Sequence, residues 1–258
     1  MYRLSSPASS LVWLMAAALG GAVGCAAAPP AARPGPAHPA ALQTPEPSVQ
    51  ENQAHGSALS PAEATAEVAY YRERSVALAG GASTEIARTD FVRLRRGRLY
   101  LTGGLPDREI PELQRRLGAA FREGNGPAVL DVTAQLIERN QADIRAHMLR
   151  AITLRQAGNE SESRRHHDLA IALLESILSG GDGLGFASSW TVFDVSEEYE
   201  VLKAKGCVPG AQALVSHEER QFDVLHARNA QSGSPCEATF DITELMAVTA
   251  RHFEGAVQ

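Results

Sequence analysis

Helical spacing of apolar positions dominates the chain after residue 60. Ser60, Pro61 and Glu63 stand in the order of an N-cap, a proline in the first helical turn and an early acid. This order predicts a helix over 61–79, which the glycine pair at 80–81 ends. A second helix is expected over 85–101, where Gly97 interrupts the pattern.

The helical pattern is clearest between residues 111 and 179. Pro111 and Pro127 each open a helix, expected over 111–124 and 127–140. Asp143 caps a third helix that ends at Gly158 and turns one face toward the core, formed by Ile144, Met148, Ala151 and Ile152. A fourth helix, over 161–179, is expected to bury Leu169, Ala170, Leu173, Leu174 and Ile177.

After Gly180 the pattern of apolar positions changes from helical spacing to short strand-like runs. A strand is expected over 190–193, a helix through about residue 204, and then three strands over 211–216, 221–227 and 238–242. A closing helix over 243–253 places Leu245, Val248, Thr249 and Phe253 along one side. The fold class is therefore predicted as α+β: helical hairpins followed by a small antiparallel β-meander with packed helices.

The start of the chain has the order of a bacterial export signal. Arg3 supplies a positive charge, and residues 11–23 form an apolar run of thirteen, which is shorter than the roughly 20 residues of a membrane span. The run ends in Ala22-Val23-Gly24-Cys25, which resembles the lipobox of bacterial lipoproteins. We therefore expect residues 1–24 to be a signal peptide and Cys25 to be lipidated. A plain secretory signal cut after Gly24, or an uncleaved anchor, are the alternatives.

Residues 25–60 are expected to form a disordered tether rich in alanine and proline. Seven prolines follow Cys25 within 35 residues, with no apolar periodicity, so this segment cannot bury enough apolar surface to fold. The domain plan is then a signal peptide (1–24), a tether (25–60), a helical region (61–179) and an α+β region (180–258) that forms one globular unit with it. The acyl chains on Cys25 would hold the domain in the periplasm, with the bilayer as a partner and the outer membrane favoured over the inner.

Charge argues against nucleic acid as a partner. The chain has 24 basic and 30 acidic residues, and the net charge is −6. Binding to phosphates requires a basic face. Arg93, Arg95, Arg96 and Arg98 form the one local basic cluster, which is typical of a solvated helix face; contact with an anion or a lipid headgroup is the alternative.

Two sequence resemblances support this plan. Gly124 and Gly158 are 34 residues apart, which is the period of the tetratricopeptide repeat, and 140–143 resembles the turn between its units. Seven motifs together resemble the bacterial domain of unknown function 4919 family over roughly residues 85–257. They are Ser176-Ile177-Leu178, Gly181-Asp182-Gly183, Val192-Phe193, Glu197-Glu198-Tyr199, Gln212-Ala213-Leu214-Val215, Gln221-Phe222-Asp223-Val224-Leu225 and Phe240-Asp241-Ile242. The resemblance implies a shared fold and an envelope lipoprotein, and it implies no activity.

The loop Gly181-Asp182-Gly183 is the candidate functional loop. A calcium loop needs several oxygen ligands at alternate positions, and only Asp182 is present. A phosphate-binding loop needs a following lysine, which is absent, so the alternative is a turn that joins helix to strand. No zinc-protease or nucleophile-elbow motif occurs. We predict no catalytic residue, no metal site and no cofactor.

Cys207 and Cys236 are the two cysteines left after Cys25. In an oxidising compartment such a pair is a candidate for a disulfide. Both lie at one end of the predicted meander, which favours a bond. They also flank its middle strand, and Cα atoms more than about 7 Å apart cannot be bridged. The sequence leaves the question open.

Two hypotheses for the function follow. The first is a non-enzymatic module that binds a protein or peptide partner in the envelope. The alternative is an envelope hydrolase whose site lies near the Gly181-Asp182-Gly183 loop. A deep pocket in which Asp182, Tyr199 and a histidine converge would favour the hydrolase, and scattered polar residues in a groove would favour binding. A purely structural role is a third possibility.

Overall fold

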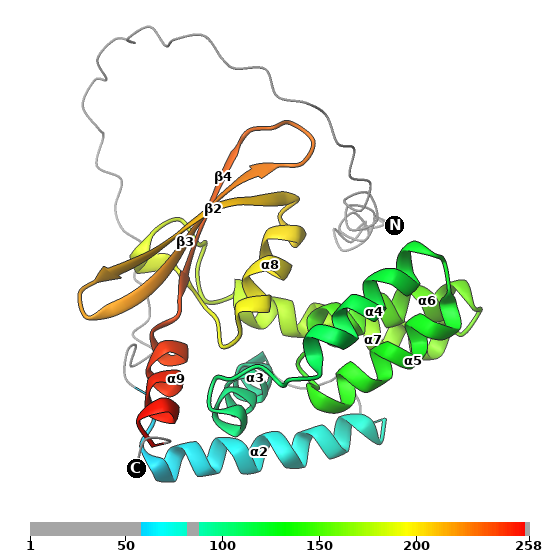
Figure 1. The fold of residues 1–258 in the computed structure, drawn as a ribbon, viewed down its shortest axis with the longest axis horizontal. Coiled ribbons are helices and arrows are strands. Elements are labelled where there is room, and N and C mark those ends of the chain that lie inside the picture. Colours follow the sequence, from blue (N-terminus) through cyan, green and yellow to red (C-terminus); the bar gives the residue numbers. More distant parts are fainter. Residues whose placement is uncertain (1–57, 82–87, 256–258) are drawn as a thin grey trace, which may run out of the picture. The chain divides into compact units, whose positions relative to one another are not determined.

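The computed structural model describes residues 58–81 and 88–255. In these ranges eight α-helices and a four-stranded sheet form one unit (Figure 1), which is the predicted α+β class. The predicted signal peptide, Cys25 and nearly all of the predicted tether lie outside the described residues. None of the described helices combines the length and the apolar character that crossing a bilayer requires.

The first two helices cross at a glycine. Helix α2 (Pro61–Ala79) begins at the predicted cap, where the Ser60 hydroxyl accepts a hydrogen bond from Glu63 N and the Glu63 carboxylate accepts one from Ser60 N. Helix α3 (Arg88–Thr102) packs along α2. A Cβ atom on Gly97 would lie 2.5 Å from Glu67 O and 2.8 Å from Tyr71 Cβ. Glycine at this helical position therefore allows the two helices to approach closely.

Four helices follow in two hairpins, α4 (Ile110–Arg122) with α5 (Gly126–Arg139) and α6 (Ile144–Gln156) with α7 (Glu160–Leu178). Each packs on the next along the chain. The predicted cap Asp143 accepts a hydrogen bond from a backbone N–H of the first turn of α6, and Asn159 does the same for α7. One core cluster joins the first hairpin to α6 and includes Leu113, Leu117, Ala120, Val129, Val132, Leu136, Ile137 and, from α6, Ala146.

The predicted core face of α7 is confirmed, because all five apolar residues assigned to it are buried. On α6 three of the four assigned residues are buried and Ile152 is half-buried. Helix α9 (Thr243–Gly255) closes the chain and packs on α3 and on the sheet. Its Leu245 and Val248 are buried, whereas Phe253 is 57% exposed.

The sheet is mixed, with strand order β1-β4-β3-β2. Strands β2 (Cys207–His217), β3 (Arg220–Asn229) and β4 (Pro235–Asp241) form the predicted antiparallel meander. The short β1 (Trp190–Thr191) pairs in parallel with β4, because α8 (Val195–Ala204) and the β2–β3 hairpin intervene before the chain returns. The Trp190 and Phe240 rings pack at 5.7 Å between β1 and β4.

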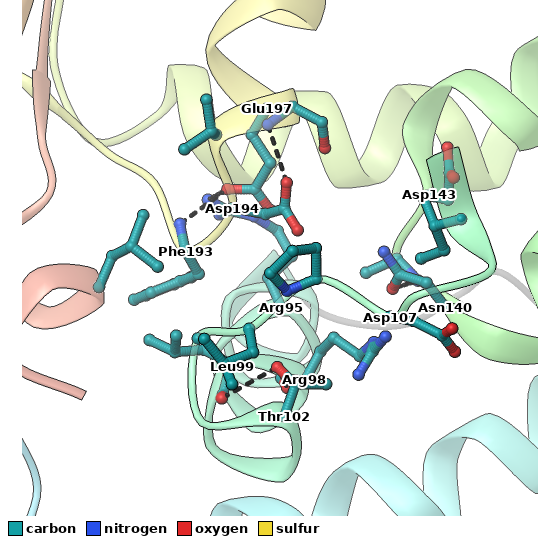
Figure 2. A pocket seen from close by; sticks show the side chains of 18 of the residues that line it. Arg95, Arg98, Leu99, Thr102, Asp107, Asn140, Asp143, Phe193, Asp194 and Glu197 are labelled. Carbon is teal, nitrogen blue, oxygen red and sulfur yellow. Dashed lines mark hydrogen bonds and ion pairs between the residues drawn. The ribbon is translucent and has the colours of Figure 1, made fainter. Parts of the chain in front are cut away.

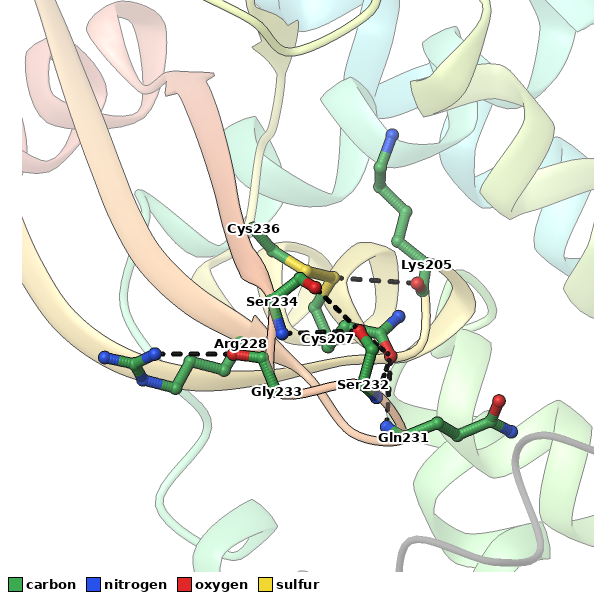
Figure 3. Close-up of a disulfide and its surroundings, with 9 residues drawn as sticks. Lys205, Cys207, Arg228, Gln231, Ser232, Gly233, Ser234 and Cys236 are labelled. Atoms are coloured by element: carbon green, nitrogen blue, oxygen red, sulfur yellow. Dashed lines mark hydrogen bonds between the residues drawn. A yellow bond between two sulfur atoms is a disulfide. The ribbon is translucent and has the colours of Figure 1, made fainter. Parts of the chain in front are cut away.

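A disulfide joins Cys207 and Cys236 (Figure 3). Both strands are longer than predicted, so the cysteines lie within β2 and β4, opposite Asn229 and Ala227 of the middle strand. A register shift between Pro209 and Gln212 marks a bulge in β2, and bulges bend and twist a strand. With this distortion the two Cα atoms lie 6.4 Å apart, within reach of a bond although a strand runs between them.

Candidate functional site

The Gly181-Asp182-Gly183 loop folds onto Trp190. Asp182 Oδ1 accepts hydrogen bonds from Leu184 N (2.8 Å) and Ser188 Oγ (2.5 Å), and these bonds lower the pKa of this exposed carboxyl group. Gly183 has φ 73°, and a Cβ there would lie 2.1 Å from the Trp190 ring. Gly181 O accepts the Trp190 indole N–H at 3.0 Å. The conformation of the loop is thus explained by its packing against the Trp190 ring.

The sequence predicted a solvated helix face for the basic cluster of α3, formed by Arg93, Arg95, Arg96 and Arg98, and the structure contradicts this prediction. Arg93 is paired with Glu67 on α2 (3.1 Å) and Arg96 with Glu244 on α9 (3.1 Å). Arg95 is 2% exposed. The prediction failed because α3 is covered on several sides, by α2, α7 and α9, so its polar residues meet partners that a local pattern does not reveal.

Arg95 and Glu197 form a buried ion pair across 102 positions of sequence (Figure 2). Arg95 Nε and Nη2 each lie 2.8 Å from a Glu197 carboxylate oxygen. Ser176 Oγ and Thr191 O accept further hydrogen bonds from the guanidinium, and Phe193 N donates to Glu197 at 2.9 Å. These hydrogen bonds offset the cost of burying the two side chains. It fixes the first turn of α8 against α3.

A pocket of about 320 Å³ opens beside this ion pair (Figure 2). Its walls come from α3, from the connection between α3 and α4, from the 140–143 turn and from the start of α8. Leu245 of α9 closes it on one side. The volume lies at the small end of the range for ligand pockets, which suits a small molecule or the end of a chain.

Arg98 is the charged group of the pocket that lacks a partner. Its Nε is buried, and within the described part of the chain nothing accepts a hydrogen bond from its guanidinium. Arg93, Arg95 and Arg96 of the same helix each have a carboxylate within 3.1 Å. A buried N–H donor without an acceptor costs about 1–3 kcal/mol.

Three aspartates line the other walls, and each caps a turn of backbone. Asp107 Oδ1 accepts from Glu109 N (2.9 Å), Asp143 Oδ1 from Ala146 N (2.8 Å), and Asp194 Oδ1 from Ser196 N (2.8 Å). Burial raises the pKa of Asp143 to about 6, against the opposing effect of its hydrogen bond. The pocket therefore combines one arginine that lacks an acceptor with three aspartates that cap backbone turns, of which Asp107 also pairs with Arg139 at 3.7 Å.

The remaining acids of the family-like motifs have structural surroundings. Glu198 is fully buried, and burial followed by the nearby Asp223 raises its pKa to about 8. Asp223 accepts a hydrogen bond from Gln212 at 2.6 Å. Asp241 accepts one from Arg220 at 2.6 Å and caps the turn at Thr243. These contacts join the sheet to α8 and α9.

Two histidines form a buried chain of hydrogen bonds between α6 and α7. Arg150 Nε donates to His166 Nε2 (3.1 Å), so a neutral His166 carries its proton on Nδ1 and donates to His147 Nδ1 (2.9 Å). His147 Nε2 then donates to Gln141 O. Burial lowers the pKa of His147 to about 3 and that of His166 to about 4. Within the described ranges, no group of three or more metal-ligating side chains could hold a metal ion.

Comparison with known proteins places this fold in a family. A family model described as a domain of unknown function (DUF4919) matches residues 107–250, more than half of the chain. The protein therefore belongs to the DUF4919 family. No curated protein and no solved structure gives a match. The matched segment holds the aspartate walls of the pocket, whereas Arg98 precedes it.

The pocket itself is the feature that sequence reasoning missed. The sequence identifies Asp143 only as a helix cap and Arg98 only as one member of a basic cluster. The sequence shows Arg98 only as a neighbour of Arg93, Arg95 and Arg96, and the carboxylate partners of these three come from distant segments. Nothing local shows which of the four arginines remains unpaired.

Proposed function

We propose that this protein is a lipoprotein of the bacterial cell envelope whose folded domain binds a protein or peptide partner without catalysing a reaction. The export signal, Cys25 and the proline-rich stretch to residue 60 support the anchor and the tether. Acylated Cys25 would hold the domain on the periplasmic side, and the outer membrane is favoured over the inner.

The observation that carries the binding role is the pocket beside the Arg95–Glu197 ion pair. It holds an arginine without an acceptor, several capping acids and apolar side chains. Its lining includes neither Asp182 nor Tyr199 and no histidine. The three groups that would have favoured a hydrolase thus do not meet in it, and scattered polar groups of this kind suit recognition.

Site-specific photo-crosslinking in membranes tests the binding role. A photoreactive residue replaces Gln114, which lines the pocket, in the full-length lipoprotein. The matched control replaces Gln231, which is exposed in the turn between β3 and β4. We expect one dominant adduct from position 114 and none of that mass from position 231.

Two results would contradict the proposal. One is the same set of adducts, or none, from both positions. The other is hydrolysis of envelope material by the wild-type protein that is lost in Asp182→Ala, because this would point to the hydrolase instead.

A further inference from the structure

We propose that the pocket recognises the free carboxyl end of a peptide, with Arg98 as the residue that binds the terminal carboxylate. This inference rests on the binding role proposed above and specifies the chemistry of the partner. Its starting point is the basic cluster of α3, in which Arg93, Arg95 and Arg96 have carboxylate partners within 3.1 Å, whereas Arg98 lines the pocket and its buried Nε has no acceptor.

The guanidinium of Arg98 requires a ligand that carries a hydrogen-bond acceptor. Its Nε is buried and has no acceptor among the described residues, so an acceptor from outside would remove the cost of that unpaired donor. The planar fork of arginine matches the two oxygens of a carboxylate or of a phosphate. A ligand oxyanion at Arg98 is therefore the simplest way to complete the site.

The aspartates of the pocket lining favour a carboxylate over a phosphate. Asp107, Asp143 and Asp194 all line the pocket, and each is held in place by a backbone N–H. A phosphate brings nearly two negative charges toward these groups, whereas a carboxylate brings one. An amide N–H next to the carboxylate would interact favourably with the acids. This pairing of groups describes the end of a peptide.

The size and the apolar lining agree with a chain end. A pocket of about 320 Å³ is too small for a folded surface and lies at the lower limit for ligand sites. Leu99, Leu105 and Phe193 line it together with the polar groups. We therefore expect an apolar last residue in the bound peptide, and a last residue with an acidic side chain should be repelled by the aspartates.

Titration calorimetry with short peptides tests this assignment on the full-length chain in detergent. The probes are acetylated tripeptides that end in Leu, Phe, Lys or Glu, each made as the free acid and as the C-terminal amide. We expect the Leu or Phe acid to bind best and its amide at least about 10-fold more weakly, since a hydrogen bond to a charged group contributes roughly 1.5–3 kcal/mol.

Variants of α3 separate the role of Arg98 from a general charge effect. Arg98→Gln should bind the acid no better than the amide, and Arg98→Lys should retain part of the preference. Arg93→Gln on the same helix does not line the pocket and should keep the full preference. Thermal unfolding of each variant shows whether the fold is intact. If Arg98→Gln does not fold, the preference for the acid over the amide is measured in Arg98→Lys instead.

Four results would overturn the inference. They are equal binding of acids and amides, an acid preference that survives in Arg98→Gln, tighter binding of inorganic phosphate than of any peptide acid, and absence of binding by all eight probes. The photo-crosslinking experiment then separates the two proposals. An adduct from position 114 that is unchanged in Arg98→Gln leaves the binding role standing, whereas no adduct in the wild type removes that role as well.

Discussion

Glu198 is a buried carboxyl group whose ionisation opposes folding. Its side chain is fully buried, and no N–H or O–H group of the described residues donates to its two oxygens. Burial, and then the charge of Asp223, raises its pKa from 4.5 to about 8. In the protonated form Glu198 can donate a hydrogen bond to Asp223, which explains how two acids can face each other inside the protein.

The sign of the pH dependence follows from this shift. Below the unfolded pKa of 4.5 Glu198 is protonated in both states, and between 4.5 and about 8 only the folded state keeps the proton. Stability contributed by this group is therefore lost as the pH rises from 4.5 to about 8. We expect Glu198→Gln, which is neutral at every pH, to match the wild type near pH 5. At pH 9 the variant should be more stable by an amount on the order of a few kcal/mol.

Urea unfolding at pH 5, 7 and 9 measures this difference. Glu218→Gln is the matched control, because Glu218 is exposed at the tip of the β2–β3 hairpin and its replacement should change stability by less than about 0.5 kcal/mol at each pH. A Glu198→Gln variant that is less stable than the wild type at pH 9 would show that the carboxyl group is ionised and well solvated in the folded protein.

At the scale of elements, a Gly97→Ala substitution where α2 and α3 cross has two opposing effects on stability, a gain in helix propensity and a loss from overpacking. Alanine is a better helix former than glycine by about 1 kcal/mol. At Gly97, however, the new Cβ would lie 2.5 Å from the backbone oxygen of Glu67, and backbone cannot move aside cheaply. Overpacking of this kind costs about 1–3 kcal/mol. We expect Gly97→Ala to lower the free energy of unfolding by about 1–2 kcal/mol.

Gly118→Ala provides the opposite case on α4. The nearest atom to its Cβ would be Arg122 Nη1 at 3.4 Å, the end of a flexible side chain. Here the helix preference should prevail and stabilise the protein by up to about 1 kcal/mol. Denaturant unfolding of both variants measures the change in the free energy of unfolding, which should be negative for Gly97→Ala and positive for Gly118→Ala. A stabilising Gly97→Ala would mean that the helices do not cross as closely as described.

The elements were largely predictable because their ends carry local signals. Capping residues such as Ser60 and Asp143, and glycines at 80–81 and 158, fix where helices begin and end whatever surrounds them. The parallel pairing of β1 with β4 and the bulge in β2 were not predictable, since both depend on how distant segments meet. The disulfide stayed open for the same reason, and for a loop of this length it contributes roughly 3–4 kcal/mol in the chain-entropy model.

At the scale of the whole molecule, the candidate site arises only from assembly. Arg98, Asp107, Asp143 and Asp194 come from four segments, and each has an ordinary local explanation as a surface charge or a cap. The Gly181-Asp182-Gly183 loop stands out in the sequence, yet its contacts seat Trp190. Sequence patterns mark strained or capped backbone well, whereas an unpaired charge becomes visible only when all its neighbours are known.

The proposed anchoring of this domain to a membrane depends on Cys25. Mass spectrometry of the mature N-terminus, on protein expressed with its own signal segment in a bacterium, tests this most directly. We predict that the chain begins at Cys25 and carries a diacylglyceryl group on the thiol and an acyl chain on the amine, and that Cys25→Ser carries neither. A mature chain with an unmodified Cys25, or one that still begins at Met1, would contradict the envelope lipoprotein that we propose.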